Sequence, residues 1–217
     1  MTDSNVQKPA ELMKERAYRQ IHEAILNELF PPGAFLSERK LIDFLGMSKT
    51  PIKSALDRLE AEGFVQVSPK QGILVKDLAI DKVRDIFELR MVLELYICEQ
   101  LAGRLKPQEA ALLEQNLELQ KRTADEEDET GFTRADSEFH LLLSRLSGNE
   151  EIHAVMTMYQ AHLYRFALRI IRRVPNRMQA AYQDHLDIYR ALAGGDADQC
   201  RRLIQEHLAF GKGVLTN

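Results

Sequence analysis

Four side chains of metal-binding type lie in the second half of the chain. Asp136 and His140 are four residues apart, so a helix places both on one face, within reach of the same ion. His185 and His207 follow in two later helical segments. Three imidazoles and one carboxylate suit zinc, or nickel, iron or manganese if water or a ligand completes six-coordination. The spacing alone also fits histidines that lie on the surface or pack in the core.

The elements that must position these side chains are helices. From residue 81 onward the apolar residues recur at helical spacing and short breakers separate the segments. An antiparallel six-helix bundle is predicted, and its interior is available for a ligand site. If the last two helices form a hairpin, the imidazoles of His185 and His207 lie at similar height. The predicted helices cover residues 81–105, 107–125, 130–146, 149–173, 176–193 and 196–211.

The N-terminal third has a different pattern. Ser37 is expected to cap a short helix that ends at Gly46, and Ser48 to cap the next helix, whose first turn tolerates Pro51. Three helices followed by two strands predict a winged helix-turn-helix. The fold class is therefore mainly α, with this domain at residues 1–78 and an all-α six-helix antiparallel bundle at 79–217. The predicted N-terminal helices cover residues 11–29, 37–45 and 48–62, and the strands cover 64–67 and 73–75.

A helix-turn-helix places the start of its second helix in the major groove of DNA. Ser48, Lys49 and Thr50 stand at that start, Lys53 follows one turn later, and all four can donate hydrogen bonds to base edges or phosphates. Two further cations are expected to reach the duplex: Arg39 in the preceding helix and Lys70 at the tip of the wing. Taken singly, such cations also fit an ordinary solvated helix face, whereas their joint placement favours double-stranded DNA as the partner.

Residues 10–76 resemble the winged-helix domain of the GntR family of regulators. The resemblance depends on these segments: Phe30-Pro31-Pro32-Gly33, Leu36-Ser37-Glu38-Arg39, Ser48-Lys49-Thr50-Pro51-Ile52-Lys53, Leu59-Glu60-Ala61-Glu62-Gly63-Phe64 and Gly72. The chain departs from the family at Lys49 and Lys53, where arginine is usual. Because lysine lacks the two-pronged guanidinium that suits guanine, the resemblance implies a different operator preference.

The second half is similar to the C-terminal ligand-binding FCD domain of the FadR branch, in its shorter, VanR-like form. The similarity covers Asp136-x-x-Phe139-His140, Gly148-Asn149, the stretch from Asp184-His185 to Gly195-Asp196, and His207-Leu208. It implies that Asp136, His140, His185 and His207 bind one divalent metal ion, with zinc expected first. A small carboxylate effector is expected beside the ion. Arg90 is the first candidate to bind its carboxylate and Arg165 the second, although either can equally form a salt bridge alone.

The composition limits the other possibilities. The net charge of −4 argues against a protein that coats nucleic acid through bulk positive charge. No apolar run reaches the roughly 20 residues that span a bilayer, and the N-terminus has no secretory signal, so we expect a cytoplasmic protein without a membrane partner. Cys98 and Cys200 belong to no C-x-x-C pair and are expected to be reduced thiols.

The leading hypothesis is a homodimeric transcription regulator, a repressor whose affinity for its DNA operator is controlled by a small organic acid at the metal site. The alternative is a metal-dependent hydrolytic enzyme with an appended DNA-binding domain, because three histidines and one aspartate around an ion can activate water. That alternative lacks a convincing general base, since Glu138 is expected to point away from Asp136 and His140. A structural DNA-bridging protein is disfavoured by the acidic second half.

Overall fold

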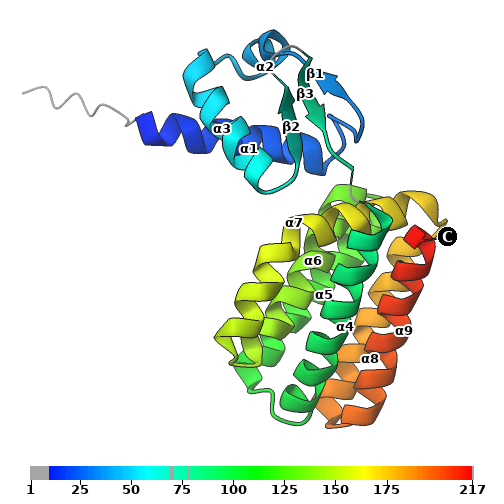
Figure 1. The fold of residues 1–217 in the computed structure, drawn as a ribbon. Helices are drawn as coiled ribbons and strands as arrows, with labels where there is room; N and C mark the ends of the chain where they lie inside the picture. Colours follow the sequence, from blue (N-terminus) through cyan, green and yellow to red (C-terminus); the bar gives the residue numbers. More distant parts are fainter. Residues whose placement is uncertain (1–9, 69–70, 78, 217) are drawn as a thin grey trace, which may run out of the picture. The chain divides into compact units, whose positions relative to one another are not determined.

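The computed structural model describes residues 10–68, 71–77 and 79–216. The chain divides into two compact units, residues 1–78 and 79–217. The first contains three helices and a small sheet, and the second contains only helices among its described residues (Figure 1). None of the described helices combines the length and apolar character that a bilayer crossing needs.

The first unit is a winged helix-turn-helix, as predicted. Its antiparallel sheet has the strand order β1-β3-β2, with Val65 opposite Val75 and Phe35 opposite Leu74. Strand β1 was not predicted, because its two residues are too short to show a pattern. The elements are α1 (Ala10–Leu26), β1 (Phe35–Leu36), α2 (Glu38–Leu45), α3 (Lys49–Ala61), β2 (Val65–Ser68) and β3 (Gly72–Val75).

Helix α1 ends at Leu26, three residues before the predicted end. Glu28 adopts a left-handed conformation with φ 59°, and the Phe30 N–H donates to the Ala24 carbonyl at 3.0 Å. This hydrogen bond closes the helix before Pro31 is reached. A local cap therefore ends the helix.

The turn between α2 and α3 follows capping rules. The Ser37 hydroxyl accepts a hydrogen bond from the Lys40 N–H at 3.1 Å, and Gly46 ends α2 with φ 63°. Ser48 occupies the N-cap position of α3, but its side chain makes no capping hydrogen bond, contrary to the prediction. Its hydroxyl is exposed instead, at the end of the helix that is predicted to meet DNA.

Gly72 begins β3 where the wing meets β1. Its φ is +96°, and a Cβ atom at this position would lie 2.7 Å from the Leu36 carbonyl oxygen. Both the backbone conformation and the close approach of β1 exclude a side chain here. Glycine at this position therefore allows the third strand of the sheet.

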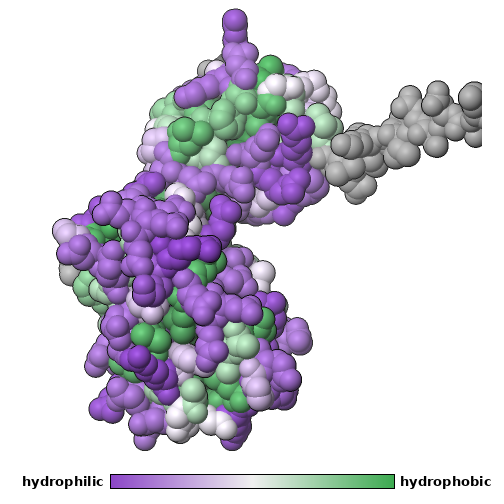
Figure 2. All heavy atoms as spheres, turned by 180° about the vertical axis from the view of Figure 1, so that it is seen from behind, coloured by the Kyte–Doolittle hydropathy of each residue, from purple (hydrophilic) through white to green (hydrophobic). Residues whose placement is uncertain are grey.

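The second unit is an antiparallel six-helix bundle, as predicted. Helix α4 packs against α9, α6 packs between α5 and α7, and α8 packs against α5 and α9. Figure 2 shows that hydrophilic side chains predominate on one face of this unit, with apolar groups among them. The helices are α4 (Ile80–Leu101), α5 (Pro107–Asp125), α6 (Glu129–Leu146), α7 (Glu150–Arg173), α8 (Arg177–Gly194) and α9 (Ala197–Thr216).

The main core of the bundle lies between α4, α5, α6, α8 and α9. It includes Phe139, Ile188, Leu192 and Ile204, all fully buried. Cys98 on α4 and Cys200 on α9 are free buried thiols in the same core, with their sulfur atoms 2.7 Å apart. The inner faces of α6, α8 and α9 meet in this region, which brings the candidate ligands on these helices together.

Candidate metal centre and DNA-reading surface

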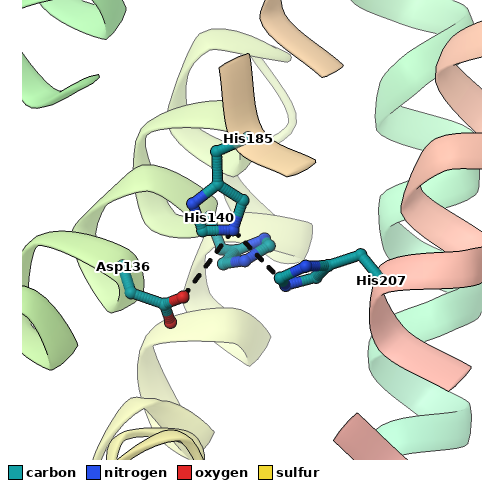
Figure 3. A group of neighbouring side chains, drawn as sticks. All are labelled: Asp136, His140, His185 and His207. Carbon is teal, nitrogen blue, oxygen red and sulfur yellow. Dashed lines mark hydrogen bonds and ion pairs between the residues drawn. The ribbon is translucent and has the colours of Figure 1, made fainter. Parts of the chain in front are cut away.

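The structure brings the four predicted metal ligands into one buried cluster. Asp136 and His140 come from α6, His185 from α8 and His207 from α9, and one ligand atom of each lies within 4.8 Å of the other three (Figure 3). The Nε2 atoms of His185 and His207 are 3.3 Å apart, and His185 Nε2 is 3.7 Å from Asp136 Oδ1. The arrangement can hold one ion, because all four side chains point at a common centre.

A carboxylate on α4 orients His140. The Nδ1 atom of His140 lies 2.7 Å from Glu94 Oε2, and the other oxygen of Glu94 accepts from Arg90 Nε at 2.5 Å. Burial alone would raise the pKa of Glu94, but the nearby Arg90 guanidinium and His140 lower it to about 2. Glu94 is therefore an ionised acceptor for the Nδ1–H of His140, whose Nε2 faces the cluster.

Two amide side chains of α5 orient His185. The Nδ1–H of His185 donates to Gln120 Oε1 at 2.7 Å. The amide of Gln120 donates in turn to Asn116 Oδ1 at 2.7 Å, and Asn116 donates to the Ala135 carbonyl at 3.0 Å. His185 and Gln120 are both fully buried. This chain of hydrogen bonds fixes the tautomer that leaves the Nε2 lone pair of His185 at the centre.

An ion pair on α8 orients His207. The Nδ1–H of His207 donates to Asp184 Oδ2 at 3.0 Å, and Arg177 Nη2 donates to the same oxygen at 3.0 Å. Arg177 is buried and stacks on the ring of Phe210, 4.4 Å from its centroid. All three imidazoles therefore share one arrangement, with Nδ1 held by an outer acceptor and Nε2 directed inward.

The electrostatics of the cluster favour metal-binding forms of the side chains. Burial lowers the pKa of His140 and His207 and lowers that of His185 well below its usual value. Neutral imidazoles are the form that binds a metal ion. Burial raises the pKa of Asp136, while His207, Arg90 and Arg177 act in the opposite direction. A divalent ion would add a stronger stabilisation of the Asp136 carboxylate.

A second observation, which does not depend on the residue types, also indicates that this cluster suits a divalent ion. The Nε2 atom of His140 is buried and has no hydrogen-bond partner among the described residues. An orphaned nitrogen beside two other imidazole nitrogens and a carboxylate carries an energetic cost that a metal ion would remove.

A cavity of about 30 Å³ adjoins the cluster and is lined by residues of α4, α6, α7, α8 and α9. Its polar lining consists of Asp136, His207, Arg90 and Arg177, and the remaining lining residues are apolar. A smaller cavity of about 10 Å³, also lined by Arg90 and Asp136, reaches His140. The first effector candidate, Arg90, thus lies beside the cluster. Arg165 is buried on α7 but does not line either cavity, so its role stays a prediction.

The side chains that orient the histidines were not predicted in that role: Glu94, Asn116, Gln120, Arg177 and Asp184. A signal for some of them was present. Arg90 and Glu94 interrupt an otherwise apolar stripe of α4, and Asn116 and Gln120 interrupt that of α5. Polar residues at buried helix positions require partners, so such interruptions indicate a buried polar site.

The first unit carries the predicted DNA-reading residues, and Arg39, Ser48, Lys49, Thr50 and Lys53 are all exposed. Lys49 forms a 2.7 Å ion pair with Glu38 of α2, and both side chains remain about half exposed or more. Lys70 lies outside the described residues.

The remaining cation of the recognition helix, Arg58, is held within the unit. It forms ion pairs with Glu15 and Glu62 and stacks on the ring of Tyr18, 3.7 Å from its centroid. These contacts hold the Arg58 guanidinium between side chains of α1 and the C-terminal end of α3.

A winged helix-turn-helix joined to a helical bundle with a buried cluster of three histidines and one aspartate is typical of a class of DNA-binding regulators. The family model described as "Bacterial regulatory proteins, gntR family" matches residues 13–75, and the model described as "FCD domain" matches residues 85–210, more than half of the chain. The chain therefore belongs to the GntR family of bacterial regulatory proteins, with an FCD domain at its C-terminal end. It is a DNA-binding transcriptional regulator.

Relatives and a solved structure agree with this assignment. The HTH-type transcriptional repressor RspR of Escherichia coli is 25% identical over 96% of this chain and 91% of its own length. An uncharacterised HTH-type transcriptional regulator in an unstable DNA locus of Streptomyces ambofaciens is 32% identical over 88% of this chain and 80% of its own. The structure of E. coli McbR/YncC shares the fold with a TM-score of 0.77 at 20% identity, covering 94% of this chain and 96% of that one. The alternative of a hydrolytic enzyme has no support in this family of regulators.

Proposed function

We propose that this regulator is a homodimeric repressor whose affinity for its operator depends on a divalent metal ion and a small organic acid in the FCD domain. The observation that carries the proposal is the common arrangement of the three histidines. Each imidazole is held at Nδ1 by an outer acceptor, and each directs Nε2 toward Asp136 and the centre. Histidines that only pack in a core have no reason to share this orientation.

The proposed ligands of the ion are Asp136, His140, His185 and His207. Three nitrogen ligands and one oxygen ligand suit zinc best, while nickel, iron or manganese would need water or the acid to complete six-coordination. The bound ion would supply a positive centre that attracts an anionic ligand. The histidines contribute by staying neutral and oriented, and Glu94, Gln120 and Asp184 keep them so.

Arg90 is the proposed effector-binding residue. Its Nε donates to Glu94, which uses one of the five N–H donors of a guanidinium, and the side chain lines both cavities beside the cluster. A carboxylate in the larger cavity would therefore meet a fixed guanidinium. Arg90 belongs to α4, the first helix after the DNA-binding unit in the sequence. The acid controls DNA affinity only if it binds one dimer geometry better than another.

The proposed DNA contacts are made by Arg39, Ser48, Lys49, Thr50, Lys53 and Lys70. In a homodimer, two copies of α3 related by a two-fold axis would read a pseudo-palindromic operator. Lys49 would exchange its ion pair with Glu38 for one with a phosphate. That exchange is inexpensive, because both partners of the pair are exposed to water.

The test combines a metal titration with a DNA-binding assay. A DNA site is first selected by the protein from a random-sequence pool, and zinc is then titrated into chelator-treated protein. We expect one zinc ion per chain, loss of this ion in His185→Ala, and a change in operator affinity when carboxylic acids are added to the zinc form. Zinc binding that is unchanged in His185→Ala would refute the site, and acids that bind without altering operator affinity would refute the coupling.

A further inference from the structure

The charges around the metal centre are nearly balanced before any ligand binds. Arg90 pairs with Glu94, and Arg177 pairs with Asp184. With the three histidines neutral, three carboxylates and two guanidiniums leave a single net negative charge, which is that of Asp136. A divalent ion reverses this to a single net positive charge. Because uncompensated charge is costly in a buried site, one further negative charge would complete the balance.

The wall of the larger cavity gives a second, independent restriction. Its polar lining consists of Asp136, His207, Arg90 and Arg177, and every other lining residue is apolar. Among the described residues that line this cavity, none is serine, threonine, asparagine, glutamine or tyrosine. A polar group on the part of a ligand that lies against Phe87, Ile170 and Gly211 would therefore lose its hydration without gaining a hydrogen bond.

The cavity also has little free space beside Gly211. Gly211 of α9 lines it, and a Cβ atom at this position would lie 3.2 Å from Ile170 Cδ1 and 3.3 Å from Phe87 Cε1. Phe87 in turn stacks on Phe166, with centroids 5.7 Å apart, so its ring has little freedom to move. Even one added methyl group would intrude on the space beside Phe87.

From these observations we infer that the effector is a monocarboxylate with a short hydrocarbon body: its single carboxylate meets the ion and Arg90, and its body lies against Phe87, Ile170 and Gly211. This inference rests on the proposed function and specifies the ligand class of that site. Two features disfavour a dicarboxylate: its second negative charge would exceed the charge balance, and its second carboxylate would lie against the apolar side chains of the cavity.

The test uses four probes that share a four-carbon skeleton: butyrate, succinate, 4-hydroxybutyrate and the neutral butyramide. Each is titrated calorimetrically into the zinc-loaded full-length protein. We expect butyrate to bind at least about tenfold more tightly than succinate and 4-hydroxybutyrate, and butyramide not to bind, because each disfavoured probe buries an unpaired polar group or lacks the charge. Succinate or 4-hydroxybutyrate binding as tightly as butyrate would overturn the inference. Failure of every acid would instead count against the proposed function.

Two variants test the two restrictions separately. Asp184→Asn removes one negative charge and so makes the net charge of the site more positive by one. At saturating zinc, this change should raise the affinity for succinate relative to butyrate by at least about threefold. The effect is moderate because Asp184 is partly exposed. Gly211→Ala should weaken butyrate binding more than acetate binding. Gly194→Ala, where an added Cβ meets nothing within 4 Å, is its control. An unchanged ratio in Asp184→Asn refutes the charge argument, and equal loss of both acids in Gly211→Ala refutes the placement of the hydrocarbon body.

Discussion

Replacing Gln120 by methionine tests whether the outer hydrogen bonds prepare the metal centre. Methionine has similar length, but its thioether sulfur is only a weak acceptor for the Nδ1–H of His185, which has no exposed surface through which water could substitute. His185 could then carry its proton on Nε2, the atom that must bind the ion. Loss of such an outer partner typically costs about 10–100-fold in metal affinity. The unsatisfied groups left on His185 and Asn116 should also lower the free energy of unfolding of the metal-free protein by about 1–3 kcal/mol.

The assay is competition for zinc between the protein and a chromophoric chelator, at fixed pH. Gln120→Glu restores an acceptor and should recover most of the affinity, while Gln115→Met, an exposed change on the same helix, should alter nothing. Wild-type affinity in Gln120→Met, with the zinc ion still lost in His185→Ala, would refute the reasoning that the hydrogen-bond chain fixes the tautomer.

Three further outcomes are expected. Lys49→Ala combined with Lys53→Ala should weaken operator binding and reduce the slope of log affinity against log salt by about 2, because each phosphate contact contributes roughly 0.9. Gly72→Ala should destabilise the wing by about 1–3 kcal/mol, measured by hydrogen exchange of the sheet amides, since its φ is +96° and the Leu36 carbonyl leaves no room for a Cβ. Removing zinc with a chelator should lower the free energy of unfolding of the second unit, as measured by thermal unfolding. The expected loss is about 2.7 kcal/mol relative to protein in free zinc at 100 times the dissociation constant.

The first two of these outcomes have a control variant. The control for the lysine pair is the double variant Lys106→Ala with Lys121→Ala, which changes two exposed lysines of the second unit. If the slope against log salt fell equally in this control, the salt dependence would come from the overall charge of the protein and not from contacts made by α3. For the wing the control is Gly194→Ala, and unchanged exchange in Gly72→Ala would show that the strand pairing is not constrained as described. A chelator that leaves the melting temperature unchanged in the wild type would contradict the metal centre itself.

The sequence predicted both the fold and the four candidate ligands for a physical reason. The four-residue spacing of Asp136 and His140 determines that they share a helix face, whatever the helix packs against. The pairing of His185 and His207 needed only a helical hairpin, which short connections strongly favour. Helix interiors and the wing were likewise predicted because they depend on local periodicity and turn residues.

What the sequence did not predict depends on how neighbouring helices align. Whether Glu94 of α4 faces His140, or Gln120 of α5 faces His185, is decided by the axial shift and rotation between helices, which the periodicity of one helix does not contain. The early end of α1 has a different, local cause: Glu28 adopts a left-handed conformation that apolar periodicity does not mark. Cross-helix partners, in contrast, are decided by side chains that lie far apart in the sequence.

The proposed ligands and the acceptors that hold their Nδ1 atoms come from α4, α5, α6, α8 and α9. A bound ion would therefore connect five helices of the bundle at one point. On the proposed function, the same ion that prepares the pocket also holds the FCD domain closed against local opening. In a cell deprived of that ion, the domain would open more often and be degraded more quickly by proteases. Metal supply would then set the abundance of this regulator as well as its response.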